Sequence, residues 1–318
     1  MKITRRTMLA GSLAATAPLP ALARAPAPIE RFPIWPGSPP GGAGLTVRDE
    51  VVKRSANGAP DDIAWPHVAI PMLNVVPAAN PNGGAILMIP GGGYARVALG
   101  REGSSIARMF AGRGFTTFEL LYRLPHDGWA AGPDAPLQDA QRAMRLIRAQ
   151  ASRWKVDPVR IAVAGFSAGG HLAARLASRA GLETYAPVDD ADRQAARPAV
   201  AGLFFPVITL ADPTAHAQSR RELLGSDVSA GRIRRFSAET DLPADMPPTF
   251  VAHAADDPAV KPANSLLMFT ALQTAKIPSE LHIFEKGGHG LPLVEESGAA
   301  HPWPALFERF ARRHGLQA

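Results

Sequence analysis

The sequence of 318 residues predicts an α/β fold, in which a mostly parallel eight-stranded sheet is covered by helices on both faces. Two observations lead to this prediction. From residue 85 onward, short apolar runs alternate with segments of helical periodicity, and such alternation builds parallel sheets with crossover helices. In addition, a G-x-S-x-G pattern at residues 165–169 stands between a strand-like run, 159–164, and a helix-like run, 170–177.

Eight candidate strands and five candidate helices account for this architecture. The first two strand candidates have no helix between them, so we expect them to form an antiparallel edge of the sheet. The expected strands are residues 45–54, 68–76, 85–89, 115–122, 159–164, 200–208, 249–252 and 280–284, and the expected helices are residues 103–111, 137–153, 170–177, 264–275 and 303–314.

Two stretches interrupt the alternation, residues 183–197 and 211–248. Both follow expected elements on the edge where an open α/β sheet binds ligands. Neither is long enough for an independent domain, so we expect loops and short helices that shape a substrate pocket.

The composition is that of a globular chain with a full core, since 46% of the residues are hydrophobic and 19% are charged. The formal net charge of +6 includes three bases in an N-terminal leader, which leaves 31 bases against 28 acids. This near balance gives no reason to expect a nucleic-acid partner. The chain has no cysteine, which excludes thiolate nucleophiles and cysteine-based metal sites.

Residues 1–23 are typical of a twin-arginine export signal. Arg5 and Arg6 precede a weakly apolar stretch, 9–22, that is too short to span a bilayer. Cleavage after Ala23 or Ala25 would fit the small-residue rule, although Pro26 disfavours the second position. We therefore expect a periplasmic or secreted protein without membrane insertion after processing.

Residues 24–44 are rich in proline and glycine and are too irregular to predict a packed element. The sequence therefore divides into a signal peptide, 1–23, a linker, 24–44, and one catalytic domain, 45–318.

Ser167 is the candidate nucleophile, because G-x-S-x-G between a strand and a helix is typical of a nucleophile elbow. Small residues around the serine allow the strand and the helix to approach. The tight turn holds the hydroxyl clear of the sheet, at the positive end of the helix.

His289 is the candidate base, since a serine hydroxyl needs a neighbouring group to remove its proton. Of the nine histidines, His289 alone follows the last expected strand in a glycine-rich loop, 286–290. His171 lies four residues after the serine, on the helix, and is expected to be structural. His253 ends a strand just before the loop of residues 254–260 (the acid loop), which holds the candidate acid, and is expected to pack there or to support the acid.

Asp257 is the candidate acid, because it follows the preceding strand and gives the chain order serine, acid, histidine. The adjacent Asp256 competes for this role. We favour Asp257 because it begins an Asp-x-x-Val pattern, in which Val260 would anchor the loop to the core. Either aspartate could instead act as a turn or N-cap residue before the next helix.

Backbone N–H groups must stabilise the negative oxygen that forms during acyl transfer. One donor is expected at Ala168, directly after the serine. Others are expected from the loop of residues 90–94, Pro-Gly-Gly-Gly-Tyr, which stands between a buried strand and a helix. Three glycines allow the backbone to pass close to a substrate with its amides turned inward.

Taken together, these motifs resemble those of the bacterial α/β-hydrolase esterases related to acetyl xylan esterases and feruloyl/acetylxylan esterases. The resemblance covers about residues 45–315 and rests on residues 90–94, 122–125, 139–143, 165–173 and 282–290. It implies an α/β-hydrolase fold and hydrolysis of carboxylic esters, commonly acetylated plant polysaccharide fragments, without cofactor or metal. It assigns the triad to Ser167, Asp257 and His289, and the oxyanion donors to Gly92, Gly93 and Ala168.

One position departs from the related lipases, because Pro90 stands where the hormone-sensitive lipases have histidine. This argues against membership of that lipase branch. The expected substrate is a small-molecule or oligosaccharide ester with a short acyl group. A prolyl-oligopeptidase-like peptidase shares the fold and the triad, but such enzymes have a long N-terminal propeller region. A catalytically silent carbohydrate-binding protein is the other alternative, although silent relatives usually lose the serine or the histidine.

Overall fold

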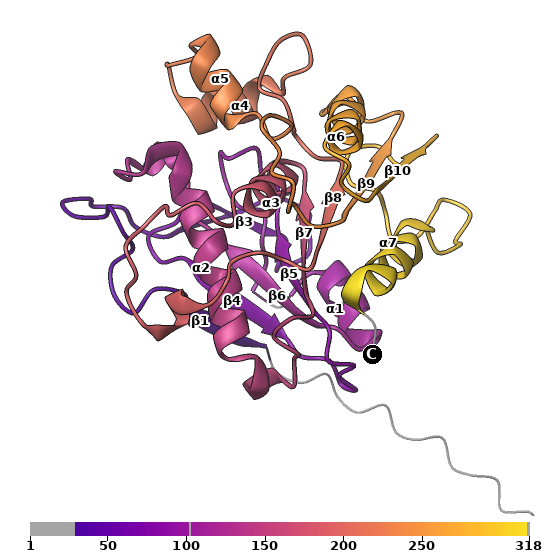
Figure 1. The fold of residues 1–318 in the computed structure, drawn as a ribbon, viewed down its shortest axis with the longest axis horizontal. Coiled ribbons are helices and arrows are strands. Elements are labelled where there is room, and N and C mark those ends of the chain that lie inside the picture. The colour runs from indigo at the N-terminus through magenta and orange to yellow at the C-terminus, as the bar shows by residue number, and fades with distance from the viewer. Residues whose placement is uncertain (1–28, 102, 317–318) are drawn as a thin grey trace, which may run out of the picture.

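The computed structural model describes residues 29–101 and 103–316, which form an eight-stranded sheet in the order β1-β4-β6-β5-β7-β8-β9-β10 (Figure 1). β4 is antiparallel to both of its neighbours, and the strands from β6 to β10 are parallel. The predicted fold class is therefore confirmed. The strands are β1 Glu30–Pro33, β4 Met72–Val76, β5 Ala85–Ile89, β6 Thr116–Leu121, β7 Ile161–Phe166, β8 Val200–Phe204, β9 Thr249–Ala254 and β10 Ser279–Phe284.

The central strands are apolar because helices cover both of their faces. Every residue of β5 and β8 is buried, and Leu87 of β5 lies opposite Val163 of β7 in the parallel register. Strands buried on both sides read as continuous apolar runs rather than as alternating ones. This is why the sequence predicts these strands most directly.

Seven α-helices accompany the sheet in the described part of the chain. Leu137 of α2, Leu172 of α3 and Met268 of α6 belong to a buried cluster on one face, whereas Phe110 of α1 and Phe307 of α7 belong to a cluster on the other. Burial of each such side chain stabilises the fold by ~1.5–3 kcal/mol. The helices are α1 Ser105–Gly112, α2 Ala135–Ala149, α3 Ala168–Ser178, α4 Ala217–Leu224, α5 Ala230–Phe236, α6 Ala263–Thr274 and α7 Trp303–Ala311.

The two stretches that interrupt the alternation do contain loops and short helices, as expected. Residues 183–197 include one 3-10 helix, Asp190–Arg193, and residues 211–248 include α4 and α5. α4 and α5 lie beyond one end of the sheet, at the top of Figure 1.

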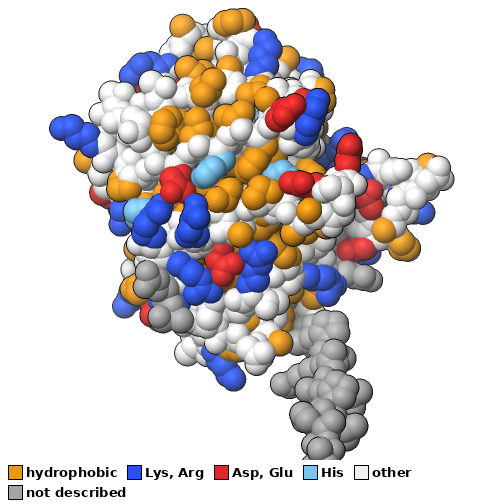
Figure 2. All heavy atoms as spheres, turned by 90° about the vertical axis from the view of Figure 1, so that its right-hand side faces the viewer, with side chains coloured by type: hydrophobic (Ala, Val, Ile, Leu, Met, Phe, Trp, Pro, Cys, Tyr) orange, Lys and Arg blue, Asp and Glu red, His pale blue; other side chains and the backbone are white. Residues whose placement is uncertain are grey.

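The side of the molecule with α6, β10 and α7 has a mixed surface (Figure 2). Hydrophobic side chains extend from the top to the middle of this face, and acidic and basic side chains are interspersed around them. Leu266, Leu267 and Ile283 are among the exposed large hydrophobic residues of these elements. This face therefore presents charges of both signs rather than a field of one sign.

The prediction of a linker over residues 24–44 is wrong for residues 30–33, because these form β1, which joins the main sheet beside β4. Ile34 and Trp35 are buried, and the Trp35 Nε1–H donates to Asp139 Oδ1 at 2.8 Å. The strand was not predicted, because the high proline content of residues 24–44 is typical of irregular structure. Proline is nevertheless tolerated at an edge, because its missing N–H removes no ladder bond there, and Pro33 lies at the strand end.

Asp139 connects two of the motifs on which the resemblance rests. The Arg123 backbone N–H donates to Asp139 Oδ2 at 2.8 Å, and the two side chains form an ion pair at 2.9 Å with no exposed surface. A buried charge is tolerated only when it is paired and hydrogen-bonded, so both residues are needed together. The pair holds α2 to the segment that follows β6.

The first expected strand, residues 45–54, is also partly wrong. Only β2, Glu50–Lys53, forms there, and it pairs with β3, Ile63–His67, in a separate two-stranded sheet. β3 is not evident from the sequence, because Pro66 interrupts its apolar pattern. The second expected strand forms as β4 and is antiparallel to both of its neighbours, but the edge of the sheet is β1.

The proposed signal peptide, 1–23, lies outside the described residues. Among the residues that the structure describes, no helix is both long enough and apolar enough to cross a membrane.

Candidate active site

Ser167 occupies the tight turn between β7 and α3 in a strained conformation, with φ 56° and ψ −121°. A Cβ atom at Gly165 would lie 2.2 Å from the carbonyl oxygen of Gly169, and a Cβ at Gly169 would lie 2.1 Å from the carbonyl oxygen of Ile89. Glycine is therefore required at both positions for β5, β7 and α3 to approach. The G-x-S-x-G pattern reflects this close packing.

Neighbouring backbone groups hold the turn in place. The Ser167 N–H donates to the Phe204 carbonyl at 3.0 Å, and the Ser167 carbonyl accepts from the Val207 N–H at 3.1 Å. Strained conformations persist only where the surroundings over-determine them, and they cluster at functional sites. These bonds fix the strained serine against β8 and the segment after it.

His289 lies between Ser167 and Asp257. Its Nε2 atom is 2.9 Å from Ser167 Oγ, and its Nδ1 atom is 2.8 Å from Asp257 Oδ2. With the proton on Nδ1, the imidazole donates to the carboxylate, and its Nε2 lone pair faces the serine hydroxyl. The structure thus brings together the three side chains, from three separate loops, that the sequence predicts as a triad.

Asp257 is buried and is held by four groups. Its Oδ1 atom accepts from the N–H groups of Ala259 and Val260 at 2.8 and 2.9 Å, while Oδ2 faces His289 and His253. Burial tends to raise the pKa of Asp257, but the hydrogen bond from His289 and those from the two amides outweigh it, so its pKa is lowered. The carboxyl group is therefore ionised at neutral pH.

Asp256 contacts a different part of the loop that holds His289, residues 286–290 (the histidine loop). Its Oδ1 atom accepts from the Gly288 N–H at 2.8 Å, and its side chain is 35% exposed, with Lys286 Nζ 3.9 Å away. Of the two adjacent aspartates, only Asp257 contacts the imidazole of His289 in this structure.

His253 supports the acid from the buried side. Its Nε2 atom lies 3.1 Å from Asp257 Oδ2 and 3.0 Å from the Val260 carbonyl, and its Nδ1 atom lies 2.7 Å from Ser265 Oγ. Burial lowers the pKa of His253, although the charge of Asp257 acts in the opposite direction. The neutral ring therefore donates its Nε2–H toward the carboxylate. The sequence indicated a position beside the acid, but not this contact.

His171 is structural, as expected. It is fully buried, with Nδ1 2.8 Å from the Tyr94 hydroxyl and Nε2 2.7 Å from the Phe236 carbonyl. Burial lowers the pKa of His171 to about 3, with a smaller contribution from the positive charge of Arg175. The neutral imidazole connects α3 to the end of α5 and to the Pro-Gly-Gly-Gly-Tyr loop of residues 90–94 (the glycine loop).

The glycine loop passes close to the elbow. Gly92 has φ 134°, and a Cβ atom there would lie 2.0 Å from the Arg96 carbonyl oxygen. Among the hydrogen bonds within the described residues, none uses the backbone N–H of Gly92, Gly93 or Ala168. The N–H of Ala168 is at the first position of α3, where an N–H has no intrahelical acceptor. These three donors remain available to a substrate oxygen.

Phe205 was not identified from the sequence as a site residue. It has φ 37°, and its ring centroid lies 4.9 Å from that of His289 in an edge-to-face arrangement. Phe166 packs against it at 6.1 Å. The sequence shows Phe205 only as part of an apolar run, because its unusual backbone angle leaves no signal in composition.

Comparison with known proteins finds two relatives among enzymes that act on xylan. A xylanase B of Butyrivibrio fibrisolvens is 34% identical to the chain, and an acetylxylan esterase of Xylanibacter ruminicola is 29% identical. Each alignment spans 215 residues and 66% of this chain. The chain spans only 33% and 42% of the length of these two relatives.

Solved structures with the α/β-hydrolase fold match nearly the whole chain. The acetyl ester-xyloside bifunctional hydrolase of Caldicellulosiruptor lactoaceticus is 30% identical, with a TM-score of 0.73, 93% of this chain covered and 100% of that one. The carboxylesterase Cest-2923 of Lactobacillus plantarum is 25% identical, with a TM-score of 0.64 and coverages of 86% and 99%. The BD-FAE family profile matches residues 75–272. The chain therefore has the α/β-hydrolase fold and belongs to the BD-FAE family.

Proposed function

We propose that this protein is a serine carboxylesterase that removes short acyl groups, chiefly acetyl, from xylan-type sugars. The observation that carries the proposal is the continuous hydrogen-bond chain from Ser167 through His289 to Asp257, at a strained turn between β7 and α3. An activated hydroxyl, a base and an orienting acid in this order are the requirements of nucleophilic acyl transfer.

In the acylation step, Ser167 Oγ attacks the ester carbonyl carbon while His289 Nε2 takes the hydroxyl proton. The Asp257 carboxylate stabilises the imidazolium that forms and keeps the ring in the required orientation. The tetrahedral intermediate then collapses. The bond to the alcohol oxygen breaks, and His289 returns the proton to the leaving alcohol.

In the deacylation step, water replaces the alcohol. His289 takes a proton from the water, whose oxygen attacks the acyl-enzyme carbonyl carbon. The bond to Ser167 Oγ then breaks, and His289 protonates the serine oxygen. The carboxylic acid leaves and the enzyme returns to its starting state, so the cycle requires no cofactor.

Three backbone amides would stabilise the negative oxygen in both steps. The N–H groups of Gly92, Gly93 and Ala168 have no acceptor among the described residues, and Ala168 begins α3, where the helix dipole is positive. Loss of one such donor typically lowers kcat by ~10²–10³. The unusual backbone angle of Gly92 supports the same role.

The surroundings of the histidine loop favour a polar alcohol group. A cavity of about 900 Å³ borders this loop beside the triad, whose three residues are not in its lining, and the lining includes Asp256, Glu285, Lys286, Glu295 and Ser297. Such side chains can hydrogen-bond the hydroxyl groups of a sugar. The printed names of the two relatives, a xylanase and an acetylxylan esterase, point to the same class of substrate.

The test is the release of acetate from acetylated xylo-oligosaccharides by the purified enzyme, measured beside the hydrolysis of p-nitrophenyl acetate. An aminoacyl p-nitroanilide serves as the peptidase substrate, and the Ser167→Ala variant is the control for contaminating activity. Acetate release that depends on Ser167 supports the proposal. Hydrolysis of the anilide alone would contradict it. If the enzyme hydrolyses neither of the two esters, it is not an esterase.

We also propose that the protein is exported in a folded state through the twin-arginine pathway to the periplasm or beyond. Arg5, Arg6 and the weakly apolar stretch after them support this proposal. Replacement of both arginines by lysine should leave the precursor in the cytoplasm, as measured by cell fractionation. Unimpaired processing of this double variant would instead indicate the general secretory route.

A further inference from the structure

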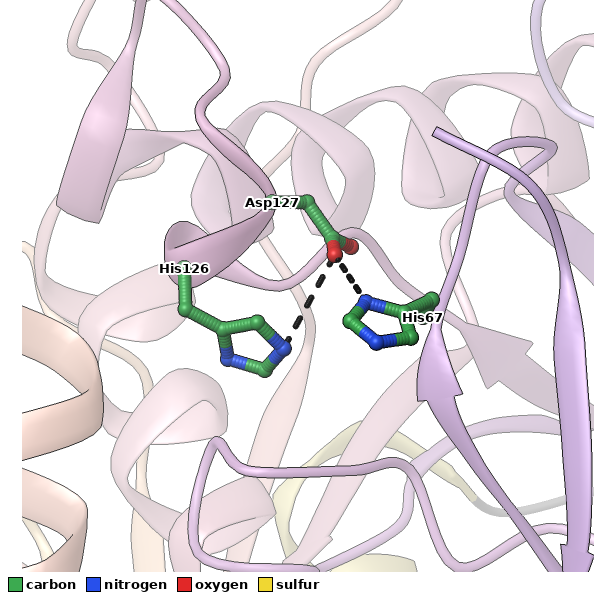
Figure 3. Close-up of side chains that lie close together, drawn as sticks. All are labelled: His67, His126 and Asp127. Atoms are coloured by element: carbon green, nitrogen blue, oxygen red, sulfur yellow. Dashed lines mark hydrogen bonds and ion pairs between the residues drawn. The ribbon is translucent and has the colours of Figure 1, made fainter. Parts of the chain in front are cut away.

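We propose that His67, His126 and Asp127 form a binding site for a divalent transition-metal ion of the Zn²⁺ type (Figure 3). One ligand atom from each side chain lies within 4.8 Å of the others. Asp127 Oδ1 is 2.6 Å from His67 Nδ1 and 3.7 Å from His126 Nε2. Both imidazoles converge on this carboxylate, and none of the three residues belongs to the proposed triad.

The three side chains come from two elements that the fold brings together. His67 ends β3, whereas His126 and Asp127 form most of a 3-10 helix, Pro125–Asp127, that follows β6. They line a cavity of about 650 Å³ together with residues 44–50. This cavity leaves room for water at a fourth coordination position, as in zinc sites that have three protein ligands.

A carboxylate faces the second ring nitrogen of each histidine. Glu50 Oε2 lies 3.8 Å from His67 Nε2, and Glu222 Oε2 lies 3.7 Å from His126 Nδ1. If His67 Nδ1 and His126 Nε2 bind the metal, each ring can donate its other N–H toward a carboxylate. Metal-binding histidines almost always have such a partner, which fixes the tautomer and raises the basicity of the ligand.

Asp127 supplies the charge for the site. Its side chain is 1% exposed, and its ion pairs within the described residues are with the two histidines, without lysine or arginine. Its Oδ2 atom accepts from the Val68 N–H at 3.2 Å, which leaves Oδ1 directed at the imidazoles. With Glu50 and Glu222, the latter also paired with Arg221 at 2.7 Å, three carboxylates lie around the two imidazoles, and a divalent cation would compensate their negative charge.

Metal binding requires side-chain movements, since the three ligand atoms lie within 4.8 Å of one another but not yet at equal distances. Ligand atoms on a tetrahedral zinc ion are ~3.3 Å apart, given bonds of ~2.0–2.1 Å. The 2.6 Å hydrogen bond between His67 and Asp127 would lengthen as the metal replaces its proton, and the 3.7 Å separation between Asp127 and His126 would shorten. His126 Nε2 would exchange its 2.9 Å hydrogen bond to the Pro66 carbonyl for the metal.

The ligand types select the metal. Two imidazoles and one carboxylate suit Zn²⁺ and neighbouring transition ions, whereas Ca²⁺ and Mg²⁺ prefer sets of oxygen ligands. A bound ion would join β3 to the 3-10 helix after β6 and, through Glu222, to α4. α4 also carries Gln218, whose side chain lies beside Gly93. The expected role is therefore to stabilise α4 and the small sheet against the core.

The test is metal binding by the protein purified without a histidine tag and stripped with EDTA. We expect one equivalent of Zn²⁺ by calorimetry and by elemental analysis after dialysis, together with a rise in Tm that EDTA reverses. His67→Ala, His126→Ala and Asp127→Asn should each lose both the stoichiometric binding and the Zn²⁺-dependent rise in Tm. Glu222→Gln should weaken binding by ~10–100-fold.

The control is His282→Ala, which removes a histidine that lies 3.5 Å from Glu280 on β10 and should leave Zn²⁺ binding unchanged. The side chains of His67 and His126 are 45% and 27% exposed, so their alanine variants should fold and match the stripped wild type in Tm and in p-nitrophenyl acetate hydrolysis. The proposal is overturned if the wild type binds no stoichiometric Zn²⁺, if the ligand variants retain it, or if Ca²⁺ binds equally well.

Discussion

His253 and Asp257 form a buried contact at 3.1 Å, between the Nε2 atom of the imidazole and the Oδ2 atom of the carboxylate. The same oxygen faces His289 at 2.8 Å, so two histidines converge on one acceptor. The Ser265 hydroxyl holds the far side of the His253 ring. The orientation of Asp257 therefore depends on a residue with no direct access to Ser167.

His253→Phe should lower kcat by ~10-fold or more with little change in KM. The variant keeps an aromatic ring but removes a hydrogen bond to a charged group, and such bonds contribute ~1.5–3 kcal/mol. Steady-state kinetics with p-nitrophenyl acetate provide the measurement. Ser265→Ala, which removes only the partner of the ring, should have a smaller effect. An unchanged kcat in His253→Phe would show that His253 only fills space.

Ser167→Ala should abolish ester hydrolysis, with a decrease in kcat of ~10⁶, while the protein remains folded. The turn accepts a small side chain, because the serine hydroxyl contributes no bond to the elbow backbone itself. Circular dichroism checks the fold, and a fluorophosphonate probe should label the wild type at Ser167 but not the variant. Labelling at another serine would refute the assignment.

Asp257→Asn should lower kcat by ~10⁴, far more than Asp256→Asn, because only Asp257 contacts the His289 imidazole. Asp256 contacts the Gly288 N–H, so its replacement should mainly loosen the loop. Parallel kinetics on the two variants provide a matched comparison at adjacent positions. Greater damage in the Asp256 variant would reverse the assignment.

The stability of the protein should fall between pH 6.5 and pH 3, in part because of His171. Burial lowers the pKa of this imidazole from 6.5 to about 3, so the unfolded chain binds one more proton there within this window. The free energy of unfolding therefore decreases as the pH falls, by up to ~1.4 kcal/mol per pH unit from this group. Above pH 6.5 the His171 imidazole is neutral in both the folded and the unfolded chain, so this loss of stability is absent there.

His171→Gln should show a shallower decrease of Tm with falling pH than the wild type, whatever its stability at pH 7. Thermal unfolding at several pH values between 7 and 4 provides the measurement. His282→Gln, at a partly buried position on β10, is the comparison variant. Equal slopes in the wild type and in His171→Gln would mean that His171 is not the group that titrates.

The efficiency kcat/KM should fall steeply from acetate through butyrate to octanoate esters. Each buried CH₂ group stabilises a complex by only ~0.8 kcal/mol and needs apolar walls to do so. Phe205 and Phe166 offer such walls beside His289, but the large cavity at the histidine loop is lined with charged side chains. A series of p-nitrophenyl esters measures this dependence. Rising efficiency with chain length would favour a lipase-like function.

The sequence predicted those parts of the fold where local pattern and packing agree. β5 and β8 are buried throughout, so their apolar runs revealed them, and the glycines at 165 and 169 marked a turn that has no room for side chains at these two positions. The three proposed triad residues each follow a strand, and parallel strands bring their ends to one edge. Their proximity could therefore be inferred from chain order alone.

Other features depend on contacts between distant residues and left no local signal. β1 is a four-residue strand next to proline, and it is recognisable only once β4 offers an edge. The contact of His253 with Asp257 requires the acid loop to fold back by one turn. His67 meets His126 and Asp127 only because β3 ends beside the segment after β6, and nothing in the spacing of these residues predicts that meeting.

The position of β1 has a practical consequence for the outer edge of the sheet. A chain begun at residue 45 would lose β1 and also Trp35, the indole partner of Asp139. The outer side of β4 would then present unpaired N–H and C=O groups over a largely apolar strand, and such edges recruit strands from other molecules. The four residues Glu30–Pro33 therefore protect the edge of β4 against edge-to-edge association, and a truncation at residue 45 should make the protein more prone to aggregate.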